Sequence, residues 1–129
     1  MTKELKKILF VDDDEDIHLI VTICLRDIPH VEVLSAYSGE EAVKSVMDFH
    51  PDLILLDVMM PKMDGISTLQ ALKLMPSVCT TPIIFITAKA QKNEIEEYLK
   101  YGVLDVIVKP FNPMTLAKEI QSIWDRQDG

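Results

Sequence analysis

The sequence predicts an α/β protein in which a parallel sheet of five strands is covered by five helices. Two observations carry this prediction. Short apolar runs alternate along the chain with longer stretches whose apolar residues recur at helical spacing, a pattern typical of parallel strands joined by helical crossovers. The chain has 129 residues, which is long enough for one domain with a full core and too short for two ordinary ones. We therefore expect residues 1–129 to form a single domain.

The N-terminal part of the chain predicts two pairs of a strand and a helix. The first strand is expected at Lys7–Val11 and the second at Val31–Ala36. Ser38 stands three residues before Glu41, which is the signature of a capped helix start. The two predicted helices have apolar faces made of Ile17, Ile20, Val21, Cys24 and Leu25 in the first, and of Ala42, Val43 and Val46 in the second.

The middle of the chain predicts the central strand. Leu53–Asp57 is almost wholly aliphatic, as expected for a strand covered on both faces. Residues 58–64 are predicted as a loop, because Pro61 and the pair Asp64-Gly65 interrupt the pattern. A third helix follows and is expected to end near Pro76; it carries Ile66, Leu69, Leu72 and Lys73.

The C-terminal part predicts two further pairs. A strand begins after Pro82 and runs to Thr87, and another ends at Lys109. Gly102 is expected to close the helix between them, and Asn112 followed by Pro113 is expected to begin the last helix as its N-cap and first residue. The apolar faces of these two helices are Ile95, Tyr98 and Leu99 in the first, and Leu116, Ile120, Ile123 and Trp124 in the second.

The composition restricts the class of partner. The formal charge is −8, from 21 acidic and 13 basic residues, so we expect no nucleic acid and no membrane surface to bind this chain. No segment is long and apolar enough to span a bilayer, and the N-terminus does not resemble a secretory signal. Cys24 and Cys79 lack metal-ligand spacing and are expected to be reduced core thiols. A cytoplasmic protein is therefore expected.

Side chains with carboxylate, hydroxyl or ammonium groups stand at the ends of four of the predicted strands. The first strand ends at the run Asp12-Asp13-Asp14, the central strand at Asp57, and the later strands at Thr87 and Lys109. The ligand crevice of an open α/β sheet lies outside the carboxyl ends of its strands. Residues far apart in sequence are therefore expected to meet in one place.

Carboxylates, a hydroxyl and an ammonium group together suit a metal ion and a phosphoryl group. Close carboxylates repel each other by roughly 4 kcal/mol per pair at an effective dielectric of about 20. Mg²⁺ compensates this repulsion and needs only one or two carboxylates, with water and phosphate oxygens completing its shell, so Asp12, Asp13 and Asp57 are candidate ligands. An aspartate carboxylate can also attack a phosphoryl group to form an acyl phosphate. Thr87 and Lys109 would then donate hydrogen bonds to phosphoryl oxygens.

Each of these residues also has a purely structural interpretation. The acidic residues that follow the first strand can simply cap a helix, Thr87 can be an ordinary strand residue, and Lys109 can be a solvated lysine before a turn. None of these interpretations explains Asp57, which follows four aliphatic residues at the mouth of a buried strand. The joint placement of the set favours a site.

The motifs that carry these residues resemble the receiver domain of two-component response regulators along essentially the entire chain. They are Ile8-Leu-Phe-Val-Asp-Asp-Asp-Glu15, Pro51-Asp-Leu-Ile-Leu-Leu-Asp-Val-Met-Met-Pro-Lys-Met-Asp-Gly65, Pro82-Ile-Ile-Phe-Ile-Thr-Ala88 and Val108-Lys-Pro-Phe111. The resemblance implies a flavodoxin-like, doubly wound sheet with strand order 2-1-3-4-5. It further implies a cis peptide bond between Lys109 and Pro110.

The resemblance also implies a function as a phospho-accepting switch, alone or within a phosphorelay. Asp57 would accept a phosphoryl group from a histidine kinase or phosphotransfer protein. Asp12, Asp13, Asp57 and the backbone carbonyl of Met59 would hold Mg²⁺. The chain would catalyse only its own phosphorylation and the slow loss of phosphate, rather than act as a dedicated enzyme. The phosphoryl group would change the surface of the fourth helix, fifth strand and fifth helix, through Thr87, to control a protein partner or output domain.

Two departures concern that switch. Many family members carry Tyr or Phe where this chain has Val106, so coupled aromatic switching is not implied here. Val103 and Leu104 stand where family members often carry small or polar residues. These two apolar side chains either pack in the core or form a surface patch for a partner. Met60 is expected to fill a gap, and by resemblance Met59 and Lys89 tune the lifetime of the acyl phosphate.

Two other functions remain open from the sequence. An aspartate-nucleophile phosphohydrolase of the haloacid dehalogenase type would use Asp12 and Asp14, but the chain offers no later acidic pair for its metal. A phosphorylation-independent interaction module would not need the complete set of acidic, threonine and lysine residues. His18, His30 and His50 have no metal-ligand spacing, and we expect them to be surface or structural residues.

Overall fold

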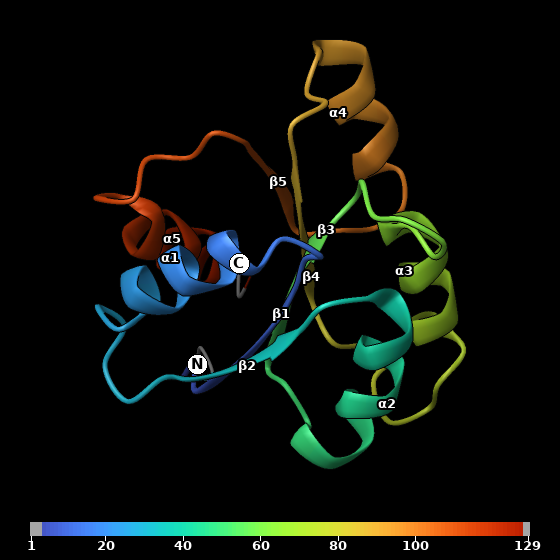
Figure 1. The fold of residues 1–129 in the computed structure, drawn as a ribbon, viewed down its shortest axis with the longest axis horizontal. Helices are drawn as coiled ribbons and strands as arrows, with labels where there is room; N and C mark the ends of the chain where they lie inside the picture. Colours follow the sequence, from blue (N-terminus) through green and yellow to red (C-terminus); the bar gives the residue numbers. More distant parts are fainter. Residues whose placement is uncertain (1–3, 128–129) are drawn as a thin grey trace.

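Strands and helices alternate from one end of the chain to the other, as the sequence predicts (Figure 1). The structure is a computed structural model that describes residues 4–127, so both ends of the expected domain of residues 1–129 lie outside it. The elements are β1 (Lys7–Val11), α1 (Glu15–Leu25), β2 (Glu32–Ala36), α2 (Gly39–Phe49), β3 (Leu53–Asp57), α3 (Gly65–Lys73), β4 (Ile83–Thr87), α4 (Lys92–Leu99), β5 (Asp105–Val108) and α5 (Leu116–Arg126).

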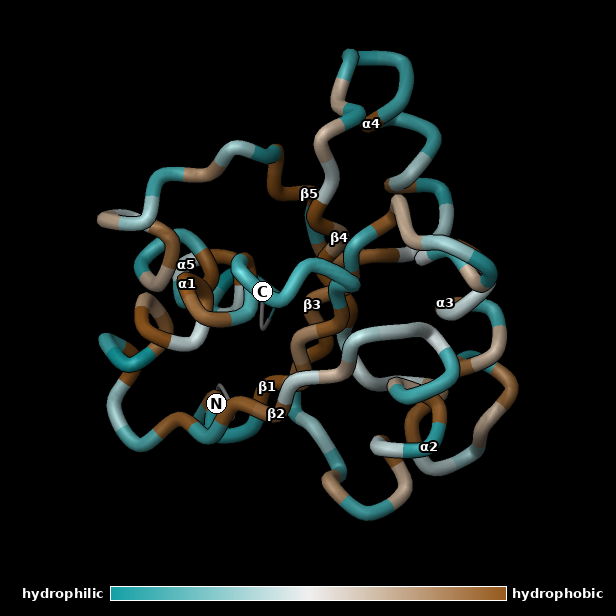
Figure 2. Tube along the Cα trace, viewed as in Figure 1, coloured by the Kyte–Doolittle hydropathy of each residue, from teal (hydrophilic) through white to brown (hydrophobic). Residues whose placement is uncertain are grey.

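The five strands form one parallel sheet in the order β2-β1-β3-β4-β5. This is the predicted doubly wound arrangement. β3 lies at the centre of the sheet and all five of its residues are buried, which explains its aliphatic sequence. In Figure 2 the strands make up the hydrophobic centre of the molecule, whereas the ends of the helices and the loops around them are more polar.

Helices cover both faces of the sheet. α1 and α5 pack on one face, and α2, α3 and α4 pack on the other (Figure 1). Successive strand residues point to opposite faces. In β3, Leu55 therefore joins the core under α1 and α5, while Ile54 and Leu56 join the core under the other three helices. This alternation also decides where the residues beyond the strand ends point.

Several predicted boundaries are wrong by one to three residues. β2 begins at Glu32 rather than Val31, and α3 ends at Lys73 rather than near Pro76. α5 begins at Leu116 with Thr115 as its N-cap, so Asn112 does not begin it. The physical reason is that the Asn112 carboxamide accepts the backbone N–H of Met114 at 2.9 Å and caps a separate turn.

The predicted helix starts and stops are otherwise close to those observed. Ser38 caps α2 by accepting the N–H of Glu41 at 3.1 Å, as predicted. Gly102 has a φ of +83°, which glycine adopts without strain, and its N–H bonds the carbonyl of Leu99 at the end of α4. It stands two residues beyond the helix C-cap, Lys100.

Three expectations about burial are wrong. Leu99 does not belong to the buried face of α4 and is 42% exposed, because this helix packs through Tyr98. Ile20 does not belong to the buried face of α1 and is 40% exposed, because this helix packs through His18, Val21 and Leu25 instead. Cys24 and Cys79 are free, as expected, but both are only half-buried rather than core residues. Burial raises the pKa of the Cys24 thiol, and the charge of Asp27 adds to this effect.

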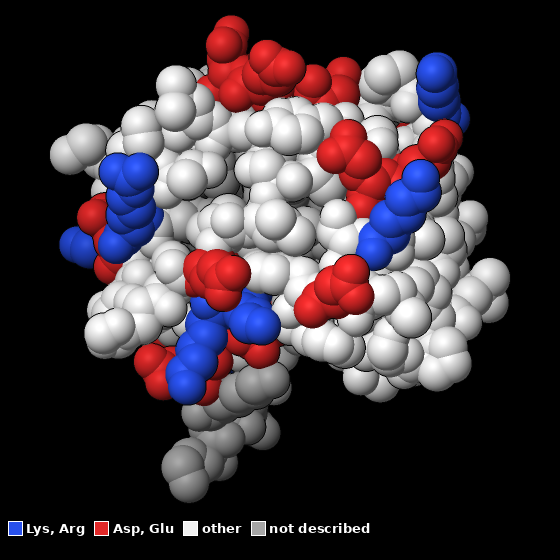
Figure 3. Space-filling model, turned by 60° about the horizontal axis from the view of Figure 1, so that its bottom comes forward, with Lys and Arg blue, Asp and Glu red and all other residues white. Residues whose placement is uncertain are grey.

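The surface agrees with the acidic composition. On the face drawn in Figure 3, basic side chains are scattered and most of them lie beside acidic ones, so that face carries no basic patch. Within residues 4–127, no helix combines the length and the apolar character needed to cross a membrane.

Candidate functional site

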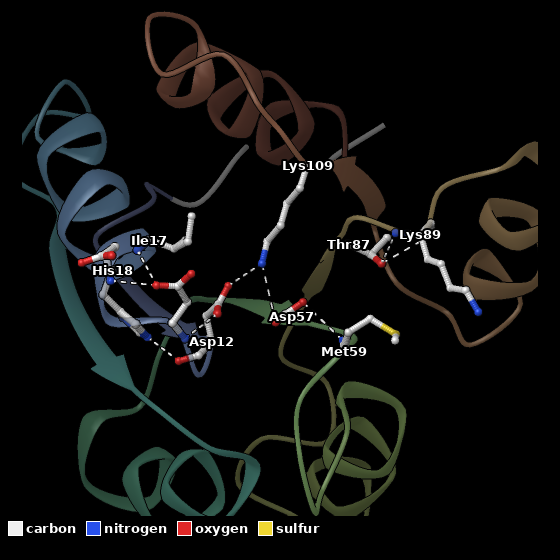
Figure 4. A network of polar contacts seen from close by, with 10 residues as sticks. Asp12, Ile17, His18, Asp57, Met59, Thr87, Lys89 and Lys109 are labelled. Carbon is white, nitrogen blue, oxygen red and sulfur yellow. Dashed lines mark hydrogen bonds and ion pairs between the residues drawn. The ribbon is translucent and has the colours of Figure 1, made fainter.

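The carboxyl ends of β1, β3 and β5 bring together the residues expected to form a site (Figure 4). The alternation along each strand explains this arrangement. Phe10, Leu55 and Ile107 all point into the core under α1 and α5. The residues two positions further along these strands are Asp12, Asp57 and Lys109, and they continue on the same side of the sheet.

Lys109 joins the two buried aspartates. Its Nζ lies 2.8 Å from Oδ2 of Asp12 and 3.6 Å from Oδ2 of Asp57 (Figure 4). Asp12 has no exposed surface and Asp57 is 3% exposed. A cation shared by two buried carboxylates offsets part of their desolvation and mutual repulsion. The sequence predicted that Lys109 would face a phosphoryl group, but did not predict that the lysine would pair with Asp12.

The third carboxylate of the cluster belongs to Asp13, which is exposed. One ligand oxygen from each of Asp12, Asp13 and Asp57 can be chosen so that all three atoms lie within 4.8 Å of one another. Hard divalent cations prefer oxygen ligands of this kind. The donor set and its spacing therefore fit Mg²⁺, and part of its coordination shell would remain open to water and phosphate.

The electrostatics of the cluster make the charged form of Asp57 less favourable than that of an exposed carboxylate. Burial raises the pKa of Asp57 to about 6, the charge of Asp12 adds to this rise, and Lys109 opposes it. Burial by itself lowers the pKa of Lys109, but its hydrogen bond and charge pairing with Asp12, together with Asp57, outweigh burial, so the net pKa is raised. Lys109 therefore stays protonated at neutral pH.

The acidic residues in the turn between β1 and α1 have two different roles: one caps the helix, and the other two belong to the site. Asp14 is the N-cap of α1 and accepts the N–H groups of Asp16 at 2.9 Å and Ile17 at 3.4 Å. Asp12 accepts the N–H of Asp14 at 2.9 Å. The structural interpretation of the acidic run therefore holds for Asp14, whereas the carboxylates of Asp12 and Asp13 face the cluster.

The loop after β3 holds Asp57 in place. The N–H of Met59 donates to Oδ1 of Asp57 at 3.3 Å, and the N–H of Gly65 donates to the carbonyl of Val58 at 2.9 Å. A Cβ atom on Gly65 would lie 2.3 Å from the carbonyl oxygen of Asp57, so only glycine fits here. The sequence marked Gly65 as a turn residue, but gave no sign of this close approach.

Thr87 lies at the rim of the site and makes no contact with the carboxylates in this structure. Its hydroxyl accepts the N–H of Lys89 at 3.0 Å (Figure 4). In the sheet Asp57 pairs with Ile86, so Thr87 stands one position further along and points to the other face. The carbonyl of Thr87 accepts the N–H of Lys109 at 2.9 Å, and the peptide bond from Lys109 to Pro110 is cis, as the resemblance implies.

His18, expected from the sequence to be a surface or structural residue, is buried beside the site. Its Nε2 donates to the backbone carbonyl of Asp12 at 2.6 Å (Figure 4). The spacing of His18 with Val21 and Leu25 on the buried face of α1 was a usable signal for its burial. His30 and His50 are exposed, as expected.

The residues near the end of the sheet serve mainly as packing. Val103 is buried in the core under α2, α3 and α4, and Val106 packs against that core while remaining half-buried. Leu104 packs against the opposite core. The core interpretation of Val103 and Leu104 is therefore correct, and Met60 is buried as a gap-filling residue.

The fold and this site define a doubly wound α/β protein with an acidic, lysine-bridged pocket at the carboxyl edge of its sheet. The family model for the response regulator receiver domain matches residues 8–121, and the chain belongs to this family.

Relatives and solved structures agree with this assignment. The chain is 41% identical over 128 residues to a probable transcriptional regulator, ycf27, of Porphyridium aerugineum, covering 99% of this chain and 51% of the relative. It is 38% identical over 125 residues to the transcriptional regulatory protein CpxR of Escherichia coli K12, covering 95% of this chain and 50% of the relative. It thus spans about half the length of these curated relatives. The chemotaxis response regulator CheY4 of Vibrio cholerae superposes with a TM-score of 0.83 at 34% identity, covering 92% of this chain and 98% of CheY4.

Proposed function

We propose that this chain is a single receiver domain, spanning residues 1–129, that accepts a phosphoryl group on Asp57 and signals through the resulting change in its surface. The observation that carries the proposal is the lysine bridge: Nζ of Lys109 lies within 3.6 Å of Asp57 and 2.8 Å of Asp12 at the carboxyl edge of the sheet. A positive group held at the mouth of a buried carboxylate is suited to an incoming phosphoryl oxygen.

The proposed reaction is a transfer from phosphohistidine. A carboxylate oxygen of Asp57 forms a bond to phosphorus while the bond from phosphorus to the donor nitrogen breaks. The electron pair of that bond stays on the donor imidazole, and the proton it needs there comes from solvent. Asp12, Asp13 and Asp57, with the backbone carbonyl of Met59, would hold Mg²⁺, which when bound screens the negative charges of the two reactants. Lys109 binds one phosphoryl oxygen. The chain later hydrolyses its own acyl phosphate slowly and turns over no separate substrate.

The proposed response begins at Thr87. The hydroxyl of Thr87 contacts the backbone of Lys89 in the loop after β4, and it would exchange this contact for a phosphoryl oxygen if the loop moved inward and the Thr87 side chain turned toward Asp57. A phosphoryl group adds about −1.5 to −2 charges at one point. The resulting change would reach α4, β5 and α5 and control a protein partner or output domain. The named relatives are transcriptional regulators about twice as long, which supports a partner or domain of that kind.

A protein donor is supported by the apolar surface beside Lys109. A shallow groove there is lined by Ile17, Ile20, Ala88, Lys109, Pro110, Phe111 and Pro113. On the adjoining face of α1, Leu19 is 65% exposed and Ile23 is 52% exposed. Exposed apolar side chains next to a reactive group suit a protein surface better than a small phosphate ester. We propose that the donor is a histidine kinase or phosphotransfer protein, and that both act in the cytoplasm.

Two measurements test the proposal. Incubation with acetyl phosphate and Mg²⁺, followed by intact mass spectrometry, is expected to give one base-labile phosphate adduct that is absent in Asp57→Asn and without metal. Ile20→Ser is expected to slow transfer from a phosphohistidine protein but not from acetyl phosphate. Leu74→Ser is the matched control, because Leu74 is exposed at the end of α3, away from the groove. An adduct that persists in Asp57→Asn would contradict the assignment.

A further inference from the structure

His18 is a buried polar residue that the proposed reaction does not use. Its side chain is 3% exposed although it stands on a helix at the surface of the sheet. The imidazole lies between two aromatic rings, with its centroid 4.6 Å from that of Phe10 and 4.2 Å from that of Tyr37. These contacts, one with the buried Phe10 and one with Tyr37, which is 40% exposed, restrain the orientation of the imidazole.

The restrained ring makes one polar contact among the described residues. Nε2 lies 2.6 Å from the backbone carbonyl oxygen of Asp12, and because a carbonyl oxygen only accepts, Nε2 carries the hydrogen. Nδ1 is buried and has no hydrogen-bond partner within residues 4–127. The imidazole thus contributes one hydrogen bond to this region, and that bond is directed at the backbone of a candidate metal ligand.

The contact completes the restraint of Asp12. The N–H of this residue donates to the carbonyl of Ala36 in β2 at 3.1 Å. Its two carboxylate oxygens accept from the N–H of Asp14 and from Lys109. Since Asp12 has no exposed surface, water cannot reach its carbonyl, and His18 satisfies it instead. The backbone N–H, the backbone carbonyl and both carboxylate oxygens of Asp12 are therefore all hydrogen-bonded.

We propose that His18 is a positioning residue of the metal site, whose Nε2 holds the backbone of Asp12 so that the Asp12 and Asp13 carboxylates keep the spacing that binds Mg²⁺. This inference rests on the proposed function. Groups that orient metal ligands typically account for about 10–100-fold in metal affinity. Loss of the Nε2 hydrogen bond would leave a buried carbonyl without a donor, and the turn from Asp12 to Asp14 would shift to satisfy it.

The test measures the affinity of the metal alone by calorimetric titration with Mg²⁺. His18→Phe keeps an aromatic ring between Phe10 and Tyr37 but removes the donor. His18→Gln replaces the ring but places an amide N–H at about the reach of Nε2. Val21→Ala is the matched control, because Val21 is fully buried on the same face of α1 and its truncation costs stability without removing a contact to Asp12. Melting in EDTA is recorded for every variant, to separate loss of stability from loss of metal affinity.

The expected result is a dissociation constant for Mg²⁺ that rises about 10–100-fold in His18→Phe. It should stay near the wild-type value in Val21→Ala and recover in His18→Gln. Phosphorylation of His18→Phe by acetyl phosphate should approach the wild-type rate at saturating Mg²⁺. A wild-type dissociation constant in His18→Phe, an equal loss in Val21→Ala, or no recovery in His18→Gln would overturn the inference. Wild-type phosphorylation would still support the proposed function in each of these cases, whereas a wild-type protein that binds no Mg²⁺ would overturn both.

Discussion

Replacing Asp57 with asparagine should stabilise the metal-free protein at neutral pH. Burial and the charge of Asp12 raise the pKa of Asp57 to about 6, against an ordinary value of 3.8. One unit of pKa difference corresponds to about 1.4 kcal/mol, so the charged form of Asp57 costs the folded state about 3 kcal/mol at pH 7. Asparagine is nearly the same size and carries no charge, so most of this cost should disappear. Lys109 keeps its shorter contact, to Asp12.

The sign of the pH dependence follows from linkage. The folded protein binds the Asp57 proton more tightly than the unfolded chain does. The contribution of Asp57 to stability is therefore highest below about pH 4 and is lost as the pH rises toward about 6. The stabilisation by Asp57→Asn should be about 3 kcal/mol at pH 7 and should shrink toward zero near pH 4.

Urea denaturation in EDTA at several pH values measures this effect. A second series at saturating Mg²⁺ should reduce the difference in free energy of unfolding between the two proteins. Metal at 100 times its dissociation constant stabilises the wild type by about 2.7 kcal/mol and Asp57→Asn by less. Equal stability of the two proteins at pH 7, or a difference that does not change between pH 4 and pH 7, would show that the charge of Asp57 does not destabilise the folded state.

Three further substitutions test other parts of the site. Lys109→Ala leaves two buried carboxylates without their cation, so we expect a loss of about 3–5 kcal/mol in metal-free urea denaturation, and an unchanged midpoint would contradict the pairing. Gly65→Ala places a Cβ atom against the carbonyl of Asp57, so stability should fall by about 1–3 kcal/mol and phosphorylation by acetyl phosphate should slow. Thr87→Ala should still take up phosphate, but its amide hydrogen exchange in α4 and β5 should no longer respond; a wild-type response would rule out the proposed role of the hydroxyl.

The position of the site could be predicted from the sequence because it depends on topology. Parallel strands end at a common edge, so Asp12, Asp57 and Lys109 had to approach one another once the strands were recognised. The period of two along each strand then accounts for their common side. The strand residues that set this alternation, Phe10 and Leu55, are strongly apolar and easy to recognise.

The details that depend on register and on close packing could not be predicted. Thr87 points away from the carboxylates because Asp57 pairs with Ile86, and no local pattern in the sequence fixes that pairing. Asn112 and Thr115 are both suitable N-cap residues, and the path of the chain after β5 decides between them. The contact of His18 with Asp12 requires a backbone carbonyl to be buried at one particular point of the turn.

The proposed role of Asp57 is tested most directly by identifying the residue that carries the phosphoryl group. Borohydride reduces an aspartyl phosphate to homoserine, and tandem mass spectrometry of the digested protein then locates the change. If Asp57 is the phospho-acceptor, homoserine is expected at residue 57 alone after incubation with acetyl phosphate and Mg²⁺. Homoserine at residue 12, as a phosphohydrolase of the haloacid dehalogenase type would give, or no homoserine at any position, would contradict this role of Asp57.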